Sequence, residues 1–457
     1  MGIYARVRHL ALVAICASGL VAGIGMAAAP GSALAAKVKC VAVTGSGSSL
    51  QAEQQTKWTG IVNPATFVLK VGTANECEAF ANKVTYTATS SGQGLEEFGL
   101  QENAATKKFE VNKTKSGNGT TLDAFVGTDD PPTEAALKEA ATASGTSALV
   151  VPTVAAPVAI VLHPPVGCLN LTYPLNIPNS ELSSVFSKTL TWDKVLLQSG
   201  ATIDELTAGA CSSNVLVEVR SDASGTSFAT KQYLCQVNST TWGSGGACES
   251  GDGFVSDAVS WPGTVDTTHI EGGKSVENKG SKGEAEAVKL TAGSIGYVNL
   301  ANAVQAGFLP TIHKPTLAAQ HLLIVATVQN KEEPVKTTEN TKGNCPTSYT
   351  FAAGVKVEAE ASKWAKVHLA NAEAPSGAYP LCTFTYDVGW ANYKATVLEG
   401  VANYNGLGTE TGATAQGYFE YMTKTGASEG QGNVENYYSP LPTSVQTVAE
   451  VVAKKVG

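Results

Sequence analysis

Short hydrophobic runs that end in glycine and hydroxyl residues recur along this chain, and they alternate with segments of helical spacing. The clearest run is residues 215–219, where valine or leucine at four of five positions predicts a buried strand. Residues 228–234 have helical spacing. Ser224, Gly225 and Thr226 therefore fall where a helix begins, and the unpaired N–H groups at that end attract negative charge.

Arg220 follows the same strand and makes this helix start a candidate oxyanion site. Its guanidinium supplies a fixed positive charge and a planar set of donors, and the hydroxyls of Ser224 and Thr226 can bond an anion oxygen. The alternative is purely structural. Serine and threonine are common N-caps, and Arg220 would then be a surface charge paired with Asp222.

Three other predicted strands end in similar small, polar residues. A strand at residues 38–43 leads through the glycine-rich loop 44–50 into a polar helix at residues 51–58. Another strand ends in the hydroxyl-rich turn 86–94, and the segment 125–131 carries a carboxylate at the strand end, before prolines that stop it. One such turn is usually only a loop, but four in this order indicate parts of a single site.

Together, the four segments resemble the periplasmic phosphate-binding proteins that deliver phosphate to an ABC importer. In that family a G-x-G-x-[ST]-F loop, a G-S-[SG]-x-G turn, an F-G-x-S-D-x-P strand end and an R-x-D-x-S-G-T helix start enclose one phosphate. The matching segments here are residues 45–50, 90–94, 125–131 and 220–226. The resemblance implies a set of phosphate-binding residues: Ser49, Leu50, Ser91, Asp129, Arg220, Ser224, Gly225 and Thr226, supported by Asp222. It implies no catalytic residue, metal or cofactor.

The resemblance also implies the fold class. Further matches at residues 151–161, 186–192, 278–297 and 438–442 extend it over nearly all of the chain after residue 36. The expected fold is α/β, with two periplasmic-binding-protein lobes, a ligand cleft between them and a two-strand hinge. The expected segments are a signal peptide at residues 1–36, lobe one at 37–152 and 304–457, and lobe two at 153–303.

The chain departs from the family pattern at a few positions. Leu50 replaces an aromatic residue, which matters little where the backbone N–H is the ligand, and Ser90 and Val126 replace glycines. Residues 103–121 and 331–342 are polar stretches that we expect to be surface insertions. None of these changes removes a side chain that the resemblance places on the ligand.

Residues 1–36 have the pattern of a secretory signal peptide. Two arginines precede an apolar run at residues 10–26, and Ala-Leu-Ala at residues 33–35 offers a cleavage site. A retained anchor helix is the alternative, which the glycine-rich run disfavours. Cys16 lies in the middle of that run, so no lipobox is evident. We expect export to the periplasm or to the extracellular and cell-wall space.

Eight cysteines follow the signal segment, and an even number in an exported protein predicts disulfides. Eight cysteines allow 105 connectivities. Pairing neighbours in the sequence keeps every bridge within one expected lobe. The expected pairs are Cys40 with Cys77, Cys168 with Cys211, Cys235 with Cys248, and Cys345 with Cys382.

The formal net charge is −8, and it becomes −10 without Arg6 and Arg8 of the signal segment. An acidic protein is a poor partner for nucleic acid. It also cannot attract an anion from a distance, so its donors must act locally in a water-poor cleft. We expect Arg220 to keep Asp129 ionised there. An ionised Asp129, which only accepts hydrogen bonds, favours protonated phosphate over sulfate.

Signatures of enzymes are missing from the sequence. The histidines after the signal segment are scattered without a metal-ligand spacing, and no G-x-S-x-G motif occurs. Residues 272–275 imitate the end of a P-loop, but Thr268 stands where that motif requires glycine. The sequence therefore favours a monomeric phosphate-binding protein that serves an ABC permease. The alternatives are a secreted cell-wall or adhesive protein that keeps the fold without transport, and a secreted hydrolase.

Overall fold

A computed structural model describes the following residues, and every structural statement below concerns these alone: 35–101, 123–169, 175–198, 204–205, 208–243, 248, 261, 278–308, 324–330, 333–335, 338–339, 342–358, 360–369, 377–395, 408–435 and 437–457. Residues Ala36–Gly457 form one compact unit. The expected signal segment, up to residue 34, and the expected insertion at 103–121 lie outside the described residues. No described helix has the length and apolar character needed to span a bilayer.

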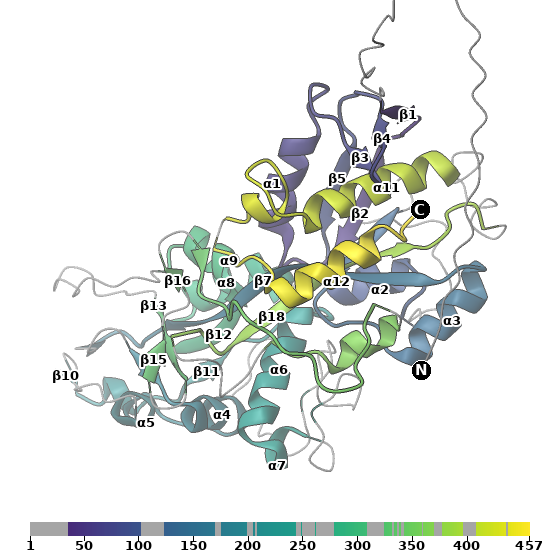
Figure 1. Cartoon of the computed structure of the whole chain (residues 1–457). Helices are drawn as coiled ribbons and strands as arrows, with labels where there is room; N and C mark the ends of the chain where they lie inside the picture. The colour runs from purple at the N-terminus through teal and green to yellow at the C-terminus, as the bar shows by residue number, and fades with distance from the viewer. Residues whose placement is uncertain are drawn as a thin grey trace, which may run out of the picture. The chain divides into compact units, whose positions relative to one another are not determined.

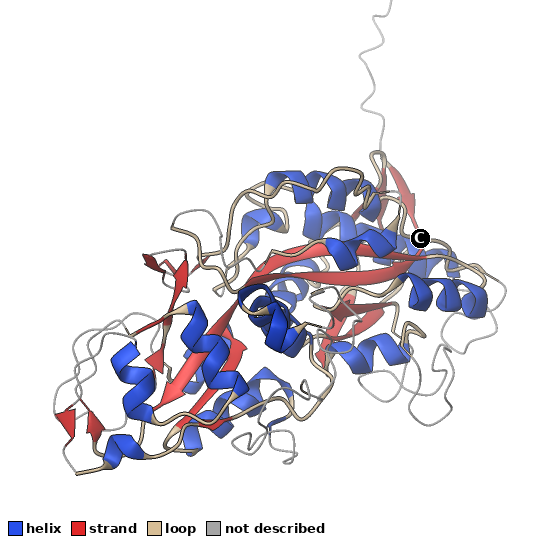
Figure 2. Ribbon diagram, turned by 90° about the horizontal axis from the view of Figure 1, so that it is seen from below, coloured by secondary structure: helices blue, strands red, loops and turns tan. Residues whose placement is uncertain are grey.

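A mixed sheet of eight strands forms the centre of this unit (Figures 1 and 2). Its order is β11-β12-β7-β18-β6-β2-β5, and β13 pairs with β7 beside it. The strands are β2 (Val43–Gly47), β5 (Val84–Ala88), β6 (Phe125–Thr128), β7 (Ala148–His163), β11 (Leu216–Val217), β12 (Ser294–Asn299), β13 (Ile324–Val325) and β18 (Cys382–Trp390). Parallel pairs β5-β2-β6 lie at one end and β11-β12 at the other.

Helices follow most of these strands, as the sequence predicts for an α/β fold. They are α1 (Ala52–Val62), α2 (Ser91–Glu97), α3 (Glu134–Ser144), α4 (Asn179–Ser187), α5 (Trp192–Gln198), α6 (Gly225–Val237), α7 (Ser239–Trp242), α8 (Gly280–Leu290), α9 (Leu300–Ala306), α11 (Gly408–Thr423) and α12 (Thr443–Ala453). Smaller elements are β1 (Ala36–Val38), β3 (Lys70–Val71), β4 (Asn75–Cys77), β8 (Cys168–Leu169), β9 (Asn176–Ile177), β10 (Asp204–Glu205), β14 (Thr327–Asn330), β15 (Glu333–Val335), β16 (Thr338–Glu339), β17 (Lys342–Gly343) and the 3₁₀ turns η1 (Ala210–Ser212), η4 (Ala361–Lys366) and η5 (Gln431–Asn433).

The long strand β7 joins the two ends of the sheet. Its first part pairs with β18 and its last six residues pair with β12. Pro152 lies inside the strand and lacks an N–H for the ladder. The register against β18 shifts between Thr385 and Tyr386, so Thr153 is the extra residue of a bulge. Its hydroxyl lies 2.7 Å from the Thr385 hydroxyl.

The first predicted strand is wrong in its bounds. Residues 36–38 form β1 beside β4, and β2 contains the glycine-rich stretch that the sequence suggested was a loop. These glycines form a strand and not a loop because the aromatic ring of Phe125 packs against this strand. A Cβ on Gly45 would lie 2.3 Å from Cζ of Phe125 in β6, so only glycine lets β2 lie between β5 and β6.

The last third of the chain packs against β3, β7 and β9. Helix α11 packs on β3, and α12 packs along β7 (Figure 1). In contrast, β13 pairs with Val161 and Leu162 of β7, and β14 pairs with β9. The predicted lobe boundaries stay a prediction, but these two strands pair with the segment expected to form lobe two.

The four expected disulfides are confirmed. They join Cys40 to Cys77, Cys168 to Cys211, Cys235 to Cys248 and Cys345 to Cys382. The last bridge ties a loop to the first residue of β18.

We predict that replacing Cys345 and Cys382 together by alanine lowers the free energy of unfolding by about 4 kcal/mol. A cross-link over 37 residues restricts the unfolded chain, and its loss restores that entropy. Urea unfolding of the wild type and of the double variant measures the difference. Equal unfolding midpoints, with unchanged m-values, would contradict the prediction.

Candidate functional site

Asp129 is the point at which three of the predicted segments meet. It follows β6 and is only 1% exposed. The Ser48 hydroxyl, from the loop after β2, donates to both carboxylate oxygens at 2.7 Å. The Ser91 hydroxyl, at the start of α2, donates to Oδ2 at 3.3 Å, and the Asp129 N–H donates back to Ser91 Oγ at 3.3 Å. The carboxylate is therefore held by the ends of two neighbouring elements.

The fourth segment reaches the same place through the N-terminus of α6. Ser224 caps this helix and accepts from the Ser227 N–H at 3.3 Å. A Cβ on Gly225 would lie 2.5 Å from Cβ of Asp129 and 2.6 Å from Ser91 Oγ. Only glycine permits this approach. The Gly92 N–H donates to the Ala223 carbonyl at 3.3 Å, which adds a second contact between these segments.

Arg220 is buried beside α6 and is held by Asp222, as the sequence suggested. Its Nε donates to Oδ1 at 2.7 Å and its Nη2 to Oδ2 at 2.5 Å, a two-pronged pair. Its Nη1 lies 3.5 Å from Thr226 Oγ1. Burial opposes the charge, but Asp222 raises the pKa of Arg220 above its usual value. The guanidinium is thus a fixed cation and not the surface charge of the alternative interpretation.

Ser49 and Leu50 occupy the turn before α1. The Leu50 N–H donates to Ser48 Oγ at 3.0 Å, and the Leu50 carbonyl accepts from Asn299 and Tyr438. Ser49 Oγ accepts from the N–H of Ser281, the second residue of α8, at 3.2 Å. The turn therefore lies between Asp129 on one side and α8 on the other.

The structure thus brings Ser91, Asp129 and Gly225 into contact with one another. Arg220, Asp222 and Thr226 form a second group, joined by hydrogen bonds of the Arg220 guanidinium. Sequence reasoning missed Ser48 because the family pattern leaves that position open. The match at residues 278–297 likewise did not single out Ser281, which contacts Ser49 in the structure.

Burial dominates the electrostatics of Asp129. It raises the pKa of Asp129 to about 7, although bonds from Ser48 and Ser91 and the charge of Arg220 act in the opposite direction. The expectation that Arg220 keeps this carboxyl ionised is therefore too simple. Near neutral pH the group takes up and releases a proton.

A buried polar network lies behind the turn. Gln51 donates to Asp387 Oδ1 at 2.9 Å and Gln55 donates to Oδ2 at 2.7 Å. The Thr153 hydroxyl donates to Gln51 Oε1 at 3.1 Å. Because Thr153 belongs to β7 and Asp387 to β18, this network ties the turn to both long strands.

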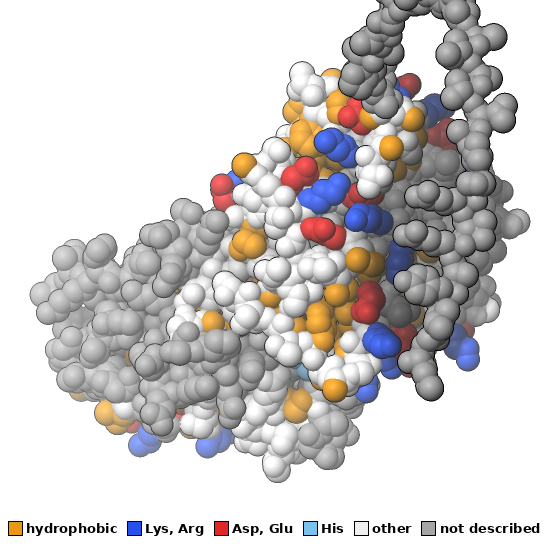
Figure 3. All heavy atoms as spheres, viewed as in Figure 1, with side chains coloured by type: hydrophobic (Ala, Val, Ile, Leu, Met, Phe, Trp, Pro, Cys, Tyr) orange, Lys and Arg blue, Asp and Glu red, His pale blue; other side chains and the backbone are white. Residues whose placement is uncertain are grey.

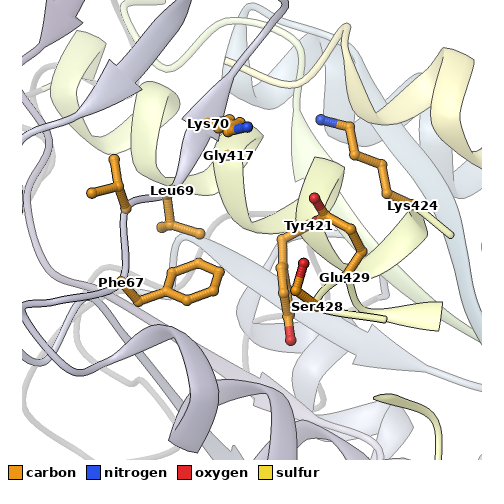
Figure 4. Close-up of a pocket in the computed structure, with 9 residues that line it drawn as sticks. Phe67, Leu69, Lys70, Gly417, Tyr421, Lys424, Ser428 and Glu429 are labelled. Carbon is orange, nitrogen blue, oxygen red and sulfur yellow. The ribbon is translucent and has the colours of Figure 1, made fainter. Parts of the chain in front are cut away.

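A separate pocket of about 160 Å³ lies between the β3 segment and α11 (Figure 4). Phe67, Leu69, Tyr421 and Lys424 are among its lining residues, and none of the predicted site residues lines it. This pocket is distinct from the candidate anion site.

The sequence model of the PBP superfamily domain matches residues 45–424 of the chain. Phosphate-binding protein PstS3 of Mycobacterium bovis (strain BCG) is 26% identical over 266 residues, as is PstS 3 of Mycobacterium tuberculosis (strain H37Rv). The alignment covers 57% of this chain and 55% of each relative, so the chain spans about half the length of the curated relatives it matches.

Solved structures share the fold. The phosphate-binding protein from Stenotrophomonas maltophilia has a TM-score of 0.53 and 18% identity, covering 90% of this chain and 93% of that one. The periplasmic phosphate-binding protein PfluDING, bound with phosphate, has a TM-score of 0.54 and 18% identity, covering 89% and 92%. The predicted two-lobed α/β fold is confirmed.

We predict that the phosphate-free protein becomes less stable as pH rises from 6 to 8. Burial raises the pKa values of Asp129, Asp387 and Glu97 to about 7. The unfolded chain has released these protons well below pH 6, so the folded state binds more protons and loses this advantage on ionisation. The expected loss is roughly 1 kcal/mol for each carboxyl over this range.

Urea unfolding at several pH values measures this dependence. In Asp387→Asn the pH dependence should shrink by the contribution of one carboxyl, roughly 1 kcal/mol over this range. A free energy of unfolding that stays constant or rises toward pH 8 would show that these carboxyls are ionised throughout.

Proposed function

The chain belongs to the PBP superfamily, and on that premise we propose that it captures inorganic phosphate between two lobes and delivers it to an ABC importer. The observation that carries the proposal is the meeting of buried Asp129 and Ser91 with the start of α6 at Gly225, beside the buried Arg220. The relatives named phosphate-binding proteins support phosphate as the ligand.

The chemistry of the side chains fits a phosphate with one proton. Arg220 supplies charge, and the hydroxyls of Ser49, Ser224 and Thr226 and the N–H groups of Leu50 and Gly225 supply donors. Ser48 already holds the Asp129 carboxylate, which leaves the Ser91 hydroxyl able to turn toward the anion. The Asp129 carboxylate accepts a hydrogen bond from the protonated oxygen of the phosphate.

The proposed lobes follow the predicted segments with one change. We place residues 324–330 with lobe two, because β13 pairs with the end of β7 and β14 pairs with β9. The return to lobe one then falls between this segment and β18. The strands β7 and β18 form the hinge, and phosphate holds the lobes closed.

Export, action as a monomer and delivery to a membrane permease are parts of the same proposal. Lys or Arg and Asp or Glu side chains are interspersed on the described part of one face, a mixed surface that suits a protein acting outside nucleic-acid complexes (Figure 3).

The two alternatives explain the site less well. A cell-wall or adhesive protein that kept only the fold would gain nothing from burying Arg220 and Asp129, whose desolvation costs free energy. A hydrolase is less well supported because the proteins that this chain resembles are named for binding phosphate and not for a reaction.

We predict that the protein, refolded free of phosphate, binds inorganic phosphate with a Kd of about 1 μM or lower, since donors from both lobes surround one anion. Arg220→Gln should weaken binding about 100-fold, because it removes two hydrogen bonds from the guanidinium to the phosphate. A hydrogen bond to a charged group contributes about 1.5 to 3 kcal/mol. Calorimetry measures both. Lys424→Gln, a change near the pocket of Figure 4, is the control and should keep the wild-type affinity. Absence of heat at millimolar phosphate in the folded wild type would refute the proposal.

We predict that Asp129→Asn weakens phosphate binding by about tenfold and strengthens sulfate binding. The amide still accepts one bond, but it also donates to an anion that has no proton of its own. In the wild type, sulfate should compete better below pH 7, where Asp129 holds a proton. Competition titrations at pH 6 and 8 test this, with Glu420→Gln, a buried carboxyl on α11, as control. An unchanged phosphate-to-sulfate ratio in Asp129→Asn would show that Asp129 is not the selector.

A further inference from the structure

The N-terminus of α8 touches both halves of the candidate anion site. The Ser281 N–H donates to Ser49 Oγ at 3.2 Å, and the Gly280 N–H donates to Asp222 Oδ1 at 3.2 Å. Ser49 is an expected phosphate ligand, and Asp222 holds Arg220. The helix start therefore lies against the expected ligands without belonging to any of the four sequence motifs.

The Ser281 side chain is fully buried, yet its hydroxyl has no hydrogen-bond partner among the residues that the structure describes. Most buried side-chain polar atoms in proteins have a partner, and leaving one without costs free energy. A buried hydroxyl without a protein partner, at the edge of an anion site, points to a ligand.

A neighbouring residue on α8 places this part of the helix near Arg220. Glu284 lies on the same face of α8 as Ser281, because residues three apart are neighbours on a helix. Its Oε1 accepts from the Tyr297 N–H at 3.2 Å, and its carboxyl interacts electrostatically with Arg220. Ser281 therefore lies on a part of α8 that is close to Arg220 as well as to Ser49.

The helix also favours an anion at this end. α8 is 11 residues long, and Lys279 at its N-cap makes no side-chain cap bond. The positive end of the helix dipole favours negative charge here, although the N–H groups of Gly280 and Ser281 already donate to Asp222 and Ser49.

We propose that Ser281 is a further phosphate-binding residue. Its hydroxyl donates to an oxygen of the anion, while its N–H fixes Ser49 Oγ so that the Ser49 hydroxyl proton is free to donate to the same anion. The inference rests on the proposed function for the identity of the ligand and adds a residue from outside the four segments expected to enclose the phosphate.

The test is Ser281→Ala, with inorganic phosphate as the probe. Phosphate affinity should fall at least about tenfold, as expected for one lost bond to a charged group. The thermal midpoint of the phosphate-free variant should stay equal to that of the wild type or rise, because the hydroxyl has no hydrogen bond to a described residue that could be lost. A merely structural serine would behave in the opposite way.

Ser294→Ala is the matched control. This serine is equally buried, but its hydroxyl donates to the carbonyls of Val288 at 3.2 Å and Thr291 at 2.6 Å. Its loss should lower the thermal midpoint and leave phosphate affinity unchanged.

The outcomes separate the two claims. A wild-type protein that binds no phosphate would overturn the proposed function and this inference with it. Wild-type binding together with unchanged affinity in Ser281→Ala would overturn the inference alone. A fall in affinity that only matches a fall in stability of the phosphate-free variant would also overturn it.

Discussion

The close approach of the α6 N-terminus to Asp129 is the contact on which the rest of the site depends. A single methyl group at Gly225 would collide with Asp129 and Ser91. At this distance the carboxyl is fully desolvated, and its pKa rises to about 7 in spite of two serine donors and Arg220. Arg220 stays charged in the same place chiefly because Asp222 holds it in a two-pronged pair, with a smaller contribution from Glu284. The absence of a side chain at Gly225 therefore allows the close packing that desolvates Asp129 and raises its pKa.

The turn that carries Ser49 and Leu50 cannot move independently of the sheet. Gln51 and Gln55 hold Asp387 of β18, and Thr153 of β7 donates to Gln51. Thr153 is available for this bond because the bulge after Pro152 displaces it from the regular ladder. A change in the relative twist of the two long strands therefore acts directly on the turn. This arrangement gives a hinge motion a physical route to the ligand.

The sequence was informative where chemistry is local. The helix start at Ser224 and the pairing of Arg220 with Asp222 could be predicted because residues two or three positions apart determine them. The four disulfides could be predicted because each joins two cysteines that are consecutive among the cysteines of the chain. The bounds of β2 were wrong because the ring of Phe125, distant in the sequence, makes glycine suitable for a central strand. Ser281 could not be found because its role comes from contacts with Ser49 across more than 200 residues. The raised pKa of Asp129 likewise depends on burial, which no motif reports.

Proton sharing connects the acidity of the protein with its proposed choice of ligand. With a formal net charge of −8, the chain cannot attract a dianion over long distances. A carboxyl that titrates near pH 7 changes this balance locally. The shared proton can reside on Asp129 or on the phosphate, and the total charge of the pair is the same in both cases. A single proton between the two oxygens therefore makes a hydrogen bond in either state. Sulfate carries no proton, so a hydrogen bond between sulfate and Asp129 requires the proton on Asp129, and Asp129 loses that proton as pH rises. The same buried carboxyl therefore tolerates phosphate on both sides of neutrality and excludes sulfate on the alkaline side.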